Sequence, residues 1–265
     1  MDYILLPGMD GNAALLMPLM DALPNEPRKS APHYVTDTVV TYRQRLAMLE
    51  FTVPERPYLL VAESYSAPLA IRFAAGCPPH LRGLVLCAGF ASSPLRGWLR
   101  IAALVASPFL FRLPPSHWML ERFLIGEGAD PGLLEQLRVS ISAVKPEVLA
   151  ARLREVLICD VRGDLAKIEV PMLYLQAQND CLVGRESLSE ILAFKPDIAV
   201  EQISGPHLLF QREPIKAAAA IDRFVQERIP IAGMPQAPFA TSPERQGTVV
   251  QVLSDYDPHA RSRDR

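Results

Sequence analysis

Three residues of this chain have the types needed to build an activated nucleophile, namely Ser64, Asp180 and His207. A serine hydroxyl is a poor nucleophile at neutral pH, but an imidazole that titrates near pH 6.5 can take its proton and later deliver it to a leaving group. A carboxylate on the other ring nitrogen fixes the tautomer and stabilises the imidazolium. These residue types therefore predict acyl-transfer chemistry, provided that the fold brings them together.

The segment around Ser64 predicts a buried strand that turns abruptly into a helix. An apolar run over 58–61 leads into a turn of small residues, and a helical pattern continues from Leu69. A strand–turn–helix with serine at its apex is typical of the G-x-S-x-G elbow, whose tight turn exposes the hydroxyl. Ala62 and Ser66 occupy the two glycine positions here. Both are small enough for the turn, although they depart from the usual pattern.

Asp180 and His207 each follow a predicted strand. The apolar run 170–175 leads into a polar loop that contains Asp180, and the alternating run 199–203 leads into a Gly-Pro loop that contains His207. The chain order of serine, then acid, then histidine is the order expected for a strand–turn–helix serine nucleophile. An ordinary loop histidine remains the alternative for His207.

Three other acids compete with Asp180 for the orienting role. Asp160 and Asp164 precede the 170–175 strand, and Asp197 precedes the 199–203 strand. Each therefore lies at the wrong end of a strand. The segment after the strand near 83–87 contains no acid, so Asp180 is the best candidate.

The chain opens with a short apolar strand, Tyr3–Leu6, followed by Pro7-Gly8-Met9-Asp10-Gly11. Two glycines so close together allow this loop to fold back tightly towards Ser64. In a fold of this kind the backbone N–H groups of the residue after the nucleophile, Tyr65, and of a residue in such a loop, by position Met9, form the oxyanion hole. The alternative interpretation is that the two glycines only form an ordinary turn between a strand and a helix.

Over residues 2–228 the chain resembles a small α/β-hydrolase of the esterase/thioesterase type. The resemblance rests on four motifs: Leu6-Pro7-Gly8-Met9-Asp10-Gly11, Ala62-Glu63-Ser64-Tyr65-Ser66, Asn179-Asp180-Cys181-Leu182-Val183 and Gly205-Pro206-His207. It implies a mostly parallel sheet of about six strands flanked by helices. The strand before Ser64 is the third in this chain, where the full family pattern has it fifth, so we expect the antiparallel hairpin that often starts this fold to be missing. It also implies a Ser64–His207–Asp180 triad with an oxyanion hole from Met9 and Tyr65. The family often has His-Gly where this chain has Pro7-Gly8.

Strands alternating with helices along the chain indicate an α/β fold with a parallel sheet. We expect the core in 1–93 and 166–228, a helical cap insertion in 94–165, and a Pro-rich tail, 229–265, that is disordered. The expected strands are 3–6, 34–36, 58–61, 84–86, 171–175 and 199–203, with a possible short strand at 248–253. The expected helices are 13–23, 42–51, a helix from about 69, 95–106, 115–125, 131–139, 146–157, 184–193 and 214–228.

The expected cap is rich in apolar side chains, including Trp98, Phe111, Trp118 and Phe123. Most of them would pack the cap onto the sheet. The alternative, residue by residue, is that some line an apolar pocket for an acyl group.

Composition narrows the class of protein. The 27 Lys and Arg residues against 29 Asp and Glu residues give a net charge of −2. The chain therefore lacks the excess positive charge that is typical of nucleic-acid-binding proteins. Four scattered cysteines without CxxC spacing indicate free thiols rather than a disulfide or zinc framework. We expect no transmembrane segment, no secretory signal and a cytoplasmic location.

These observations predict a serine hydrolase that cleaves a small ester or thioester through an acyl-enzyme, with no metal or organic cofactor. Two alternatives stay open. The same triad could transfer the acyl group to another acceptor or cleave a carbon–carbon bond. The chain could also be a non-catalytic binding protein with the same fold.

Overall fold

The computed structural model describes residues 1–95 and 108–230 and contains a six-stranded sheet in the order β2-β1-β3-β4-β5-β6. Every neighbouring pair of strands is parallel. The predicted α/β class, the count of about six strands and the lack of an antiparallel starting hairpin are confirmed. The strands are β1 Asp2–Leu6, β2 Lys29–Ser30, β3 Tyr58–Glu63, β4 Leu81–Cys87, β5 Met172–Ala177 and β6 Ala199–Ile203.

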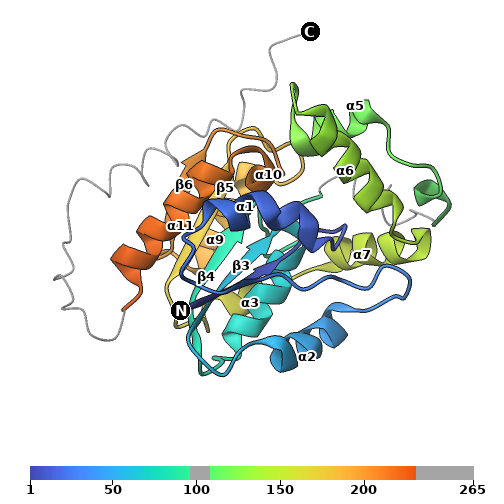
Figure 1. Ribbon diagram of the computed structural model, residues 1–265. Helices are drawn as coiled ribbons and strands as arrows, with labels where there is room; N and C mark the ends of the chain where they lie inside the picture. The colour runs from blue at the N-terminus through green and yellow to red at the C-terminus, as the bar shows by residue number, and fades with distance from the viewer. Residues whose placement is uncertain (96–107, 231–265) are drawn as a thin grey trace, which may run out of the picture. The chain divides into compact units, whose positions relative to one another are not determined.

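Helices cover both faces of the sheet (Figure 1). Side chains of α1, α10 and α11 pack on one face, and side chains of α2, α3 and α9 pack on the other. The three central strands β3, β4 and β5 are almost wholly buried, as expected for a parallel sheet that is covered twice. These helices are α1 Met17–Ala22, α2 Tyr42–Thr52, α3 Ala67–Ala75, α9 Arg185–Phe194, α10 Leu209–Arg212 and α11 Pro214–Arg228.

The regular elements described between β4 and β5 are all helices, joined by loops, and α5, α6 and α7 lie beyond one end of the sheet (Figure 1). The predicted helices at 115–125, 131–139 and 146–157 are all present, with boundaries shifted by a few residues. The first of them continues as a π-helix after a single turn. The elements are η3 Pro108–Phe111, α5 His117–Leu120, η4 Glu121–Ile125, α6 Pro131–Ser142, α7 Pro146–Ile158 and α8 Arg162–Leu165. The helix expected at 95–106 lies outside the described residues except for its first position.

The strand expected at 34–36 is wrong. The second strand is instead the two-residue β2, Lys29–Ser30, which pairs with β1. Tyr34 is buried beside the first loop, where its backbone N–H donates to the carbonyl of Gly11. Tyr34 is therefore buried beside the first loop and does not belong to the sheet. The helix expected at 13–23 begins as the 3₁₀ turn η1, Ala13–Leu16, and continues as α1.

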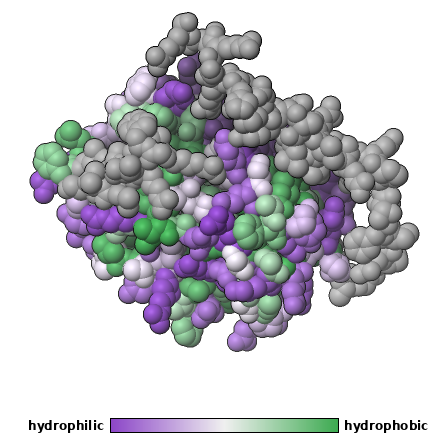
Figure 2. All heavy atoms as spheres, turned by 180° about the vertical axis from the view of Figure 1, so that it is seen from behind, coloured by the Kyte–Doolittle hydropathy of each residue, from purple (hydrophilic) through white to green (hydrophobic). Residues whose placement is uncertain are grey.

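Residues 1–229 form one compact unit. Most of the expected tail, with its possible strand at 248–253, lies outside the described residues. Over residues 1–95 and 108–230, no helix is both long and apolar enough to cross a membrane. On the described surface seen in Figure 2, hydrophilic and hydrophobic residues are interspersed.

Candidate active site

Ser64 stands at the apex of a sharp turn between β3 and α3. Strand β3 ends at Glu63, Ser64 opens the short 3₁₀ turn η2, Ser64–Ser66, and α3 follows directly. The backbone of Ser64 has φ 48°, in the left-handed region that residues other than glycine seldom adopt. Such strain is tolerated only where the surroundings impose it, and it is common at functional sites. The turn therefore has the geometry that the sequence predicts for an exposed nucleophile.

The two small residues of the elbow are accounted for by their surroundings. Ala62 and Ser66 are fully buried. The hydroxyl of Ser66 donates to the carbonyl of Pro7 at 2.5 Å and in turn accepts from the hydroxyl of Tyr34 at 2.6 Å. Serine at this position thus adds a hydrogen bond, unavailable to glycine, that joins the elbow to the first loop.

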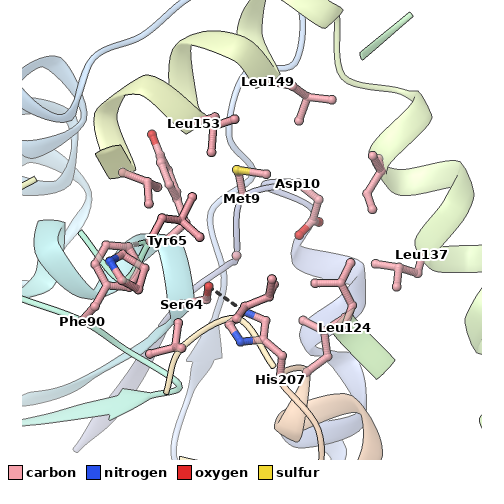
Figure 3. Close-up of a pocket in the computed structure, with 18 of the residues that line it drawn as sticks. Met9, Asp10, Ser64, Tyr65, Phe90, Leu124, Leu137, Leu149, Leu153 and His207 are labelled. Atoms are coloured by element: carbon pink, nitrogen blue, oxygen red, sulfur yellow. Dashed lines mark hydrogen bonds between the residues drawn. The ribbon is translucent and has the colours of Figure 1, made fainter. Parts of the chain in front are cut away.

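His207 and Asp180 complete a continuous chain of hydrogen bonds with Ser64. The Nε2 atom of His207 lies 2.8 Å from Ser64 Oγ (Figure 3). Its Nδ1 atom lies 2.7 Å from Asp180 Oδ2. The side chains of His207 and Asp180 are only 4% and 1% exposed. The other carboxylate oxygen of Asp180 accepts from the backbone N–H groups of Leu182 and Val183, at 2.7 and 2.9 Å. The three residues singled out in the sequence therefore meet at one point.

The competing acids lie elsewhere and have other partners. Asp160 pairs with Arg162, Asp164 with Lys167, and Asp197 with Lys195. All three are ordinary ion pairs near the surface, which contribute little to stability.

Met9 and Tyr65, the two residues expected to supply oxyanion N–H groups, flank Ser64 from different loops (Figure 3). Both line the same cavity as the hydroxyl of Ser64 and the ring of His207. An oxyanion hole with two backbone donors needs its residues beside the nucleophile, so the assignment of Met9 and Tyr65 stays a prediction.

The cavity in front of Ser64 is apolar and measures about 230 Å³. Its walls come from the loops that follow the strands and from the helices between β4 and β5. Phe111 is among the lining residues, whereas Trp118 is 66% exposed and Phe123 is 37% exposed. The apolar lining consists of Met9, Phe90, Pro94, Leu95, Phe111, Leu124, Leu137, Ile141, Leu149, Leu153, Val156, Leu182, Val183 and Leu208.

The fold of this chain superposes on those of several solved structures. A hydrolase from Oleispira antarctica superposes with a TM-score of 0.73 at 14% identity, over 86% of this chain and 92% of that one. An esterase from the thermophile Thermogutta terrifontis gives 0.71 at 20% identity, over 85% and 89%. The enol-lactonase of Burkholderia xenovorans LB400 gives 0.70 at 16% identity, over 85% and 92%. The chain has the α/β-hydrolase fold. No protein-family model and no curated protein sequence matches it.

In this α/β-hydrolase fold, the groups around His207 shift the pKa of its imidazole ring. Burial lowers the pKa of its ring, but the charge and hydrogen bond of Asp180, with a contribution from Glu63, outweigh this effect. The pKa of His207 therefore lies above its usual 6.5. The proton is held more firmly on the imidazolium, which is the property that a general base for a serine hydroxyl requires.

Four polar residues near the site were not assigned a role from the sequence. Asp10 lines the cavity, and Glu63 is buried directly before Ser64. Arg152 and Glu155 reach the site from α7. Arg152 did carry a signal, because it lies on the apolar stripe of α7 formed by Val148, Leu149, Ala150, Val156 and Leu157. An arginine at a buried helical position needs partners, and in this chain the partners are backbone carbonyls of the first loop.

The buried Glu63 carboxyl predicts a pH-dependent stability difference. Burial and the nearby Asp10 raise its pKa to about 8, against the smaller opposing effects of His207 and Gln211. Because this value lies above that of the unfolded chain, the unfolded state releases the proton first as pH rises. The free energy of unfolding contributed by this group therefore falls between about pH 4.5 and pH 8, by an amount on the order of a few kcal/mol.

Glu63→Gln removes this titration. We expect the variant to gain stability relative to the wild type as pH rises from 5 to 8, with a relative gain in melting temperature of several degrees. Thermal unfolding of both proteins at several pH values measures the difference. Glu186→Gln, an exposed glutamate near the start of α9, is the control. A stability difference between Glu63→Gln and the wild type that is constant across this range would show that Glu63 is ionised in the folded protein throughout.

Proposed function

We propose that this protein is a serine hydrolase that cleaves carboxylic esters or thioesters through an acyl-enzyme intermediate. The observation that carries the proposal is the hydrogen-bonded chain Ser64–His207–Asp180 on a serine with φ 48°. A binding protein has no need for a strained serine, a buried imidazole and a buried carboxylate in this order. The structural likeness to an esterase and to an enol-lactonase supports the same class of reaction.

In the proposed mechanism, Ser64 Oγ attacks the carbonyl carbon while His207 Nε2 takes the hydroxyl proton. Asp180 holds the proton on Nδ1 and stabilises the imidazolium. The oxyanion accepts hydrogen bonds from the N–H groups of Met9 and Tyr65. The imidazolium then protonates the departing alcohol or thiol, and the acyl group remains on Ser64. A water molecule that gives its proton to His207 releases the acid by the reverse sequence.

The lining of the cavity supports an apolar acyl group. Its walls are almost entirely aliphatic and aromatic, with Asp10 as the acidic exception beside Ser64 and His207. Each methylene group moved from water into such a cavity contributes about 0.8 kcal/mol. For p-nitrophenyl esters we therefore expect kcat/KM to rise roughly 3- to 4-fold per added methylene until the cavity is full, and then to level off.

Labelling with a fluorophosphonate, followed by mass spectrometry of the modified peptide, tests the nucleophile directly. We expect a single modification at Ser64, together with the chain-length dependence above. Assays with added alcohols separate hydrolysis from acyl transfer, because transfer would divert the acyl group to a new ester. A folded protein that is not labelled at Ser64 would instead support the non-catalytic binding protein.

A further inference from the structure

Helix α7 touches both loops that would supply the oxyanion hole. One of its side chains, Arg152, is 1% exposed and extends to the first loop. Its Nη1 atom donates to the carbonyls of Met9 and Asp10, at 2.6 and 3.0 Å, and its Nη2 atom donates to the carbonyl of Val35 at 2.7 Å. A buried guanidinium with three carbonyl partners fixes the peptide planes that follow Met9.

The second contact comes from Glu155, one turn further along the same face of α7. Its Oε2 atom accepts from the hydroxyl of Tyr65 at 2.6 Å, and its Oε1 atom accepts from the backbone N–H of Tyr42, at the start of α2. Tyr42 in turn donates its hydroxyl to the carbonyl of Tyr65 at 2.6 Å, and the two rings stack with centroids 4.8 Å apart. Tyr65 is thereby held through both its side chain and its backbone.

The same helix also forms a wall of the cavity. Leu149, Leu153 and Val156 of α7 line it beside Ser64 (Figure 3 labels the first two). These residues alternate along α7 with the two that reach the loops, so a small rotation or shift of α7 would move both sets together. A bound acyl chain that packs against Leu149 and Leu153 would therefore also settle the positions of Arg152 and Glu155.

From these contacts we infer that Arg152 and Glu155 are positioning residues for the oxyanion hole, and that α7 couples the filling of the acyl cavity to the rate of the chemical step. This inference rests on the proposed function. Binding energy gained by the remote part of the acyl chain is then expressed in the transition state rather than in substrate affinity alone. The substrate class that follows is an ester or thioester whose acyl chain is long enough to reach α7.

Arg152→Lys and Glu155→Gln test the inference, because each keeps the size of the side chain and alters its hydrogen bonds. We expect kcat to fall roughly 10- to 100-fold with KM changed less than about 3-fold, since small displacements of oxyanion donors are costly. Arg154→Lys and Glu147→Gln, on exposed positions of the same helix, are matched controls and should stay within about 2-fold of the wild type.

Two further readouts separate positioning from a purely structural role. In the wild type kcat should rise with acyl-chain length, whereas in both variants kcat should become nearly independent of length while KM still falls. A trifluoromethyl ketone, which forms a tetrahedral adduct with serine, should lose affinity by about the same factor as kcat/KM. The affinity for the carboxylic acid product of equal length should stay unchanged.

The inference is overturned if either variant, folded as judged by thermal unfolding, keeps wild-type kcat and ketone affinity. It is also overturned if kcat of the wild type does not depend on chain length. These outcomes differ from a failure of the proposed function, in which the wild-type protein itself is neither labelled at Ser64 nor active on any ester of the series.

Discussion

Ser64→Ala should abolish turnover of p-nitrophenyl esters, with kcat lowered roughly 10⁴- to 10⁶-fold. Alanine leaves no atom that can form the acyl-enzyme, and water would have to attack the carbonyl directly. The residual rate would come from the oxyanion hole and from substrate binding. Initial rates on the best ester of the chain-length series, measured with enough enzyme to detect the residual activity, give the ratio.

Alanine suits this position because it only removes the hydroxyl of serine and adds no atom to a backbone with φ 48°. The elbow should therefore keep its shape. We expect the melting temperature of Ser64→Ala to stay within a few degrees of the wild type. Ser189→Ala, on an exposed position of α9, is the matched control and should keep full activity. Wild-type esterase activity in Ser64→Ala would place the nucleophile elsewhere in the chain and refute the proposed mechanism.

Asp180→Asn should lower kcat by about 10⁴-fold, although it changes only one atom of the carboxyl group. The oxygen Oδ1 accepts two backbone N–H groups, so the amide oxygen of asparagine would occupy that place. The amide nitrogen would then face His207 Nδ1 as a donor. The imidazole would be forced to carry its proton on Nε2, towards Ser64, and could no longer accept the serine proton.

The pH profile supplies an independent check on Asp180. Because Asp180 raises the pKa of His207 above 6.5, the acid limb of kcat/KM in the wild type should lie above pH 6.5. Without this negative charge the limb should move to lower pH in Asp180→Asn. Asp197→Asn, at a surface ion pair with Lys195, is the control for removing a carboxylate. Activity of Asp180→Asn within 10-fold of the wild type would mean that another group orients His207.

The catalytic candidates were predictable from the sequence because each follows the end of a strand. In a parallel sheet these ends share one edge, so Ser64, Asp180 and His207 meet although His207 is 143 positions from Ser64. The alternation of strands and helices likewise predicted a parallel sheet covered on both faces. The count of about six strands followed from the resemblance to α/β-hydrolases.

What could not be predicted depends on side chains from distant segments. The sequence predicts a strand that includes Tyr34, whereas the hydroxyl of Tyr34 is hydrogen-bonded to the hydroxyl of Ser66 in the elbow. The roles of Arg152 and Glu155 depend on how α7 approaches the first loop and Tyr65, and no periodicity within α7 specifies those partners. Local patterns therefore predicted the helix at 146–157, but not the segments against which it packs.

The two-residue strand β2 has a consequence for self-association. The edge of a sheet presents unpaired backbone groups that can template the addition of a strand from another molecule. Lys29–Ser30 offers only a very short stretch of such groups, and the amino group of Lys29 is itself bound to the carbonyls of Met20 and Leu23. At the opposite edge, Glu201 of β6 pairs with Arg223 and places charge beside the strand. Both margins of the sheet thus disfavour intermolecular β-pairing, which guards the folded protein against aggregation by strand addition.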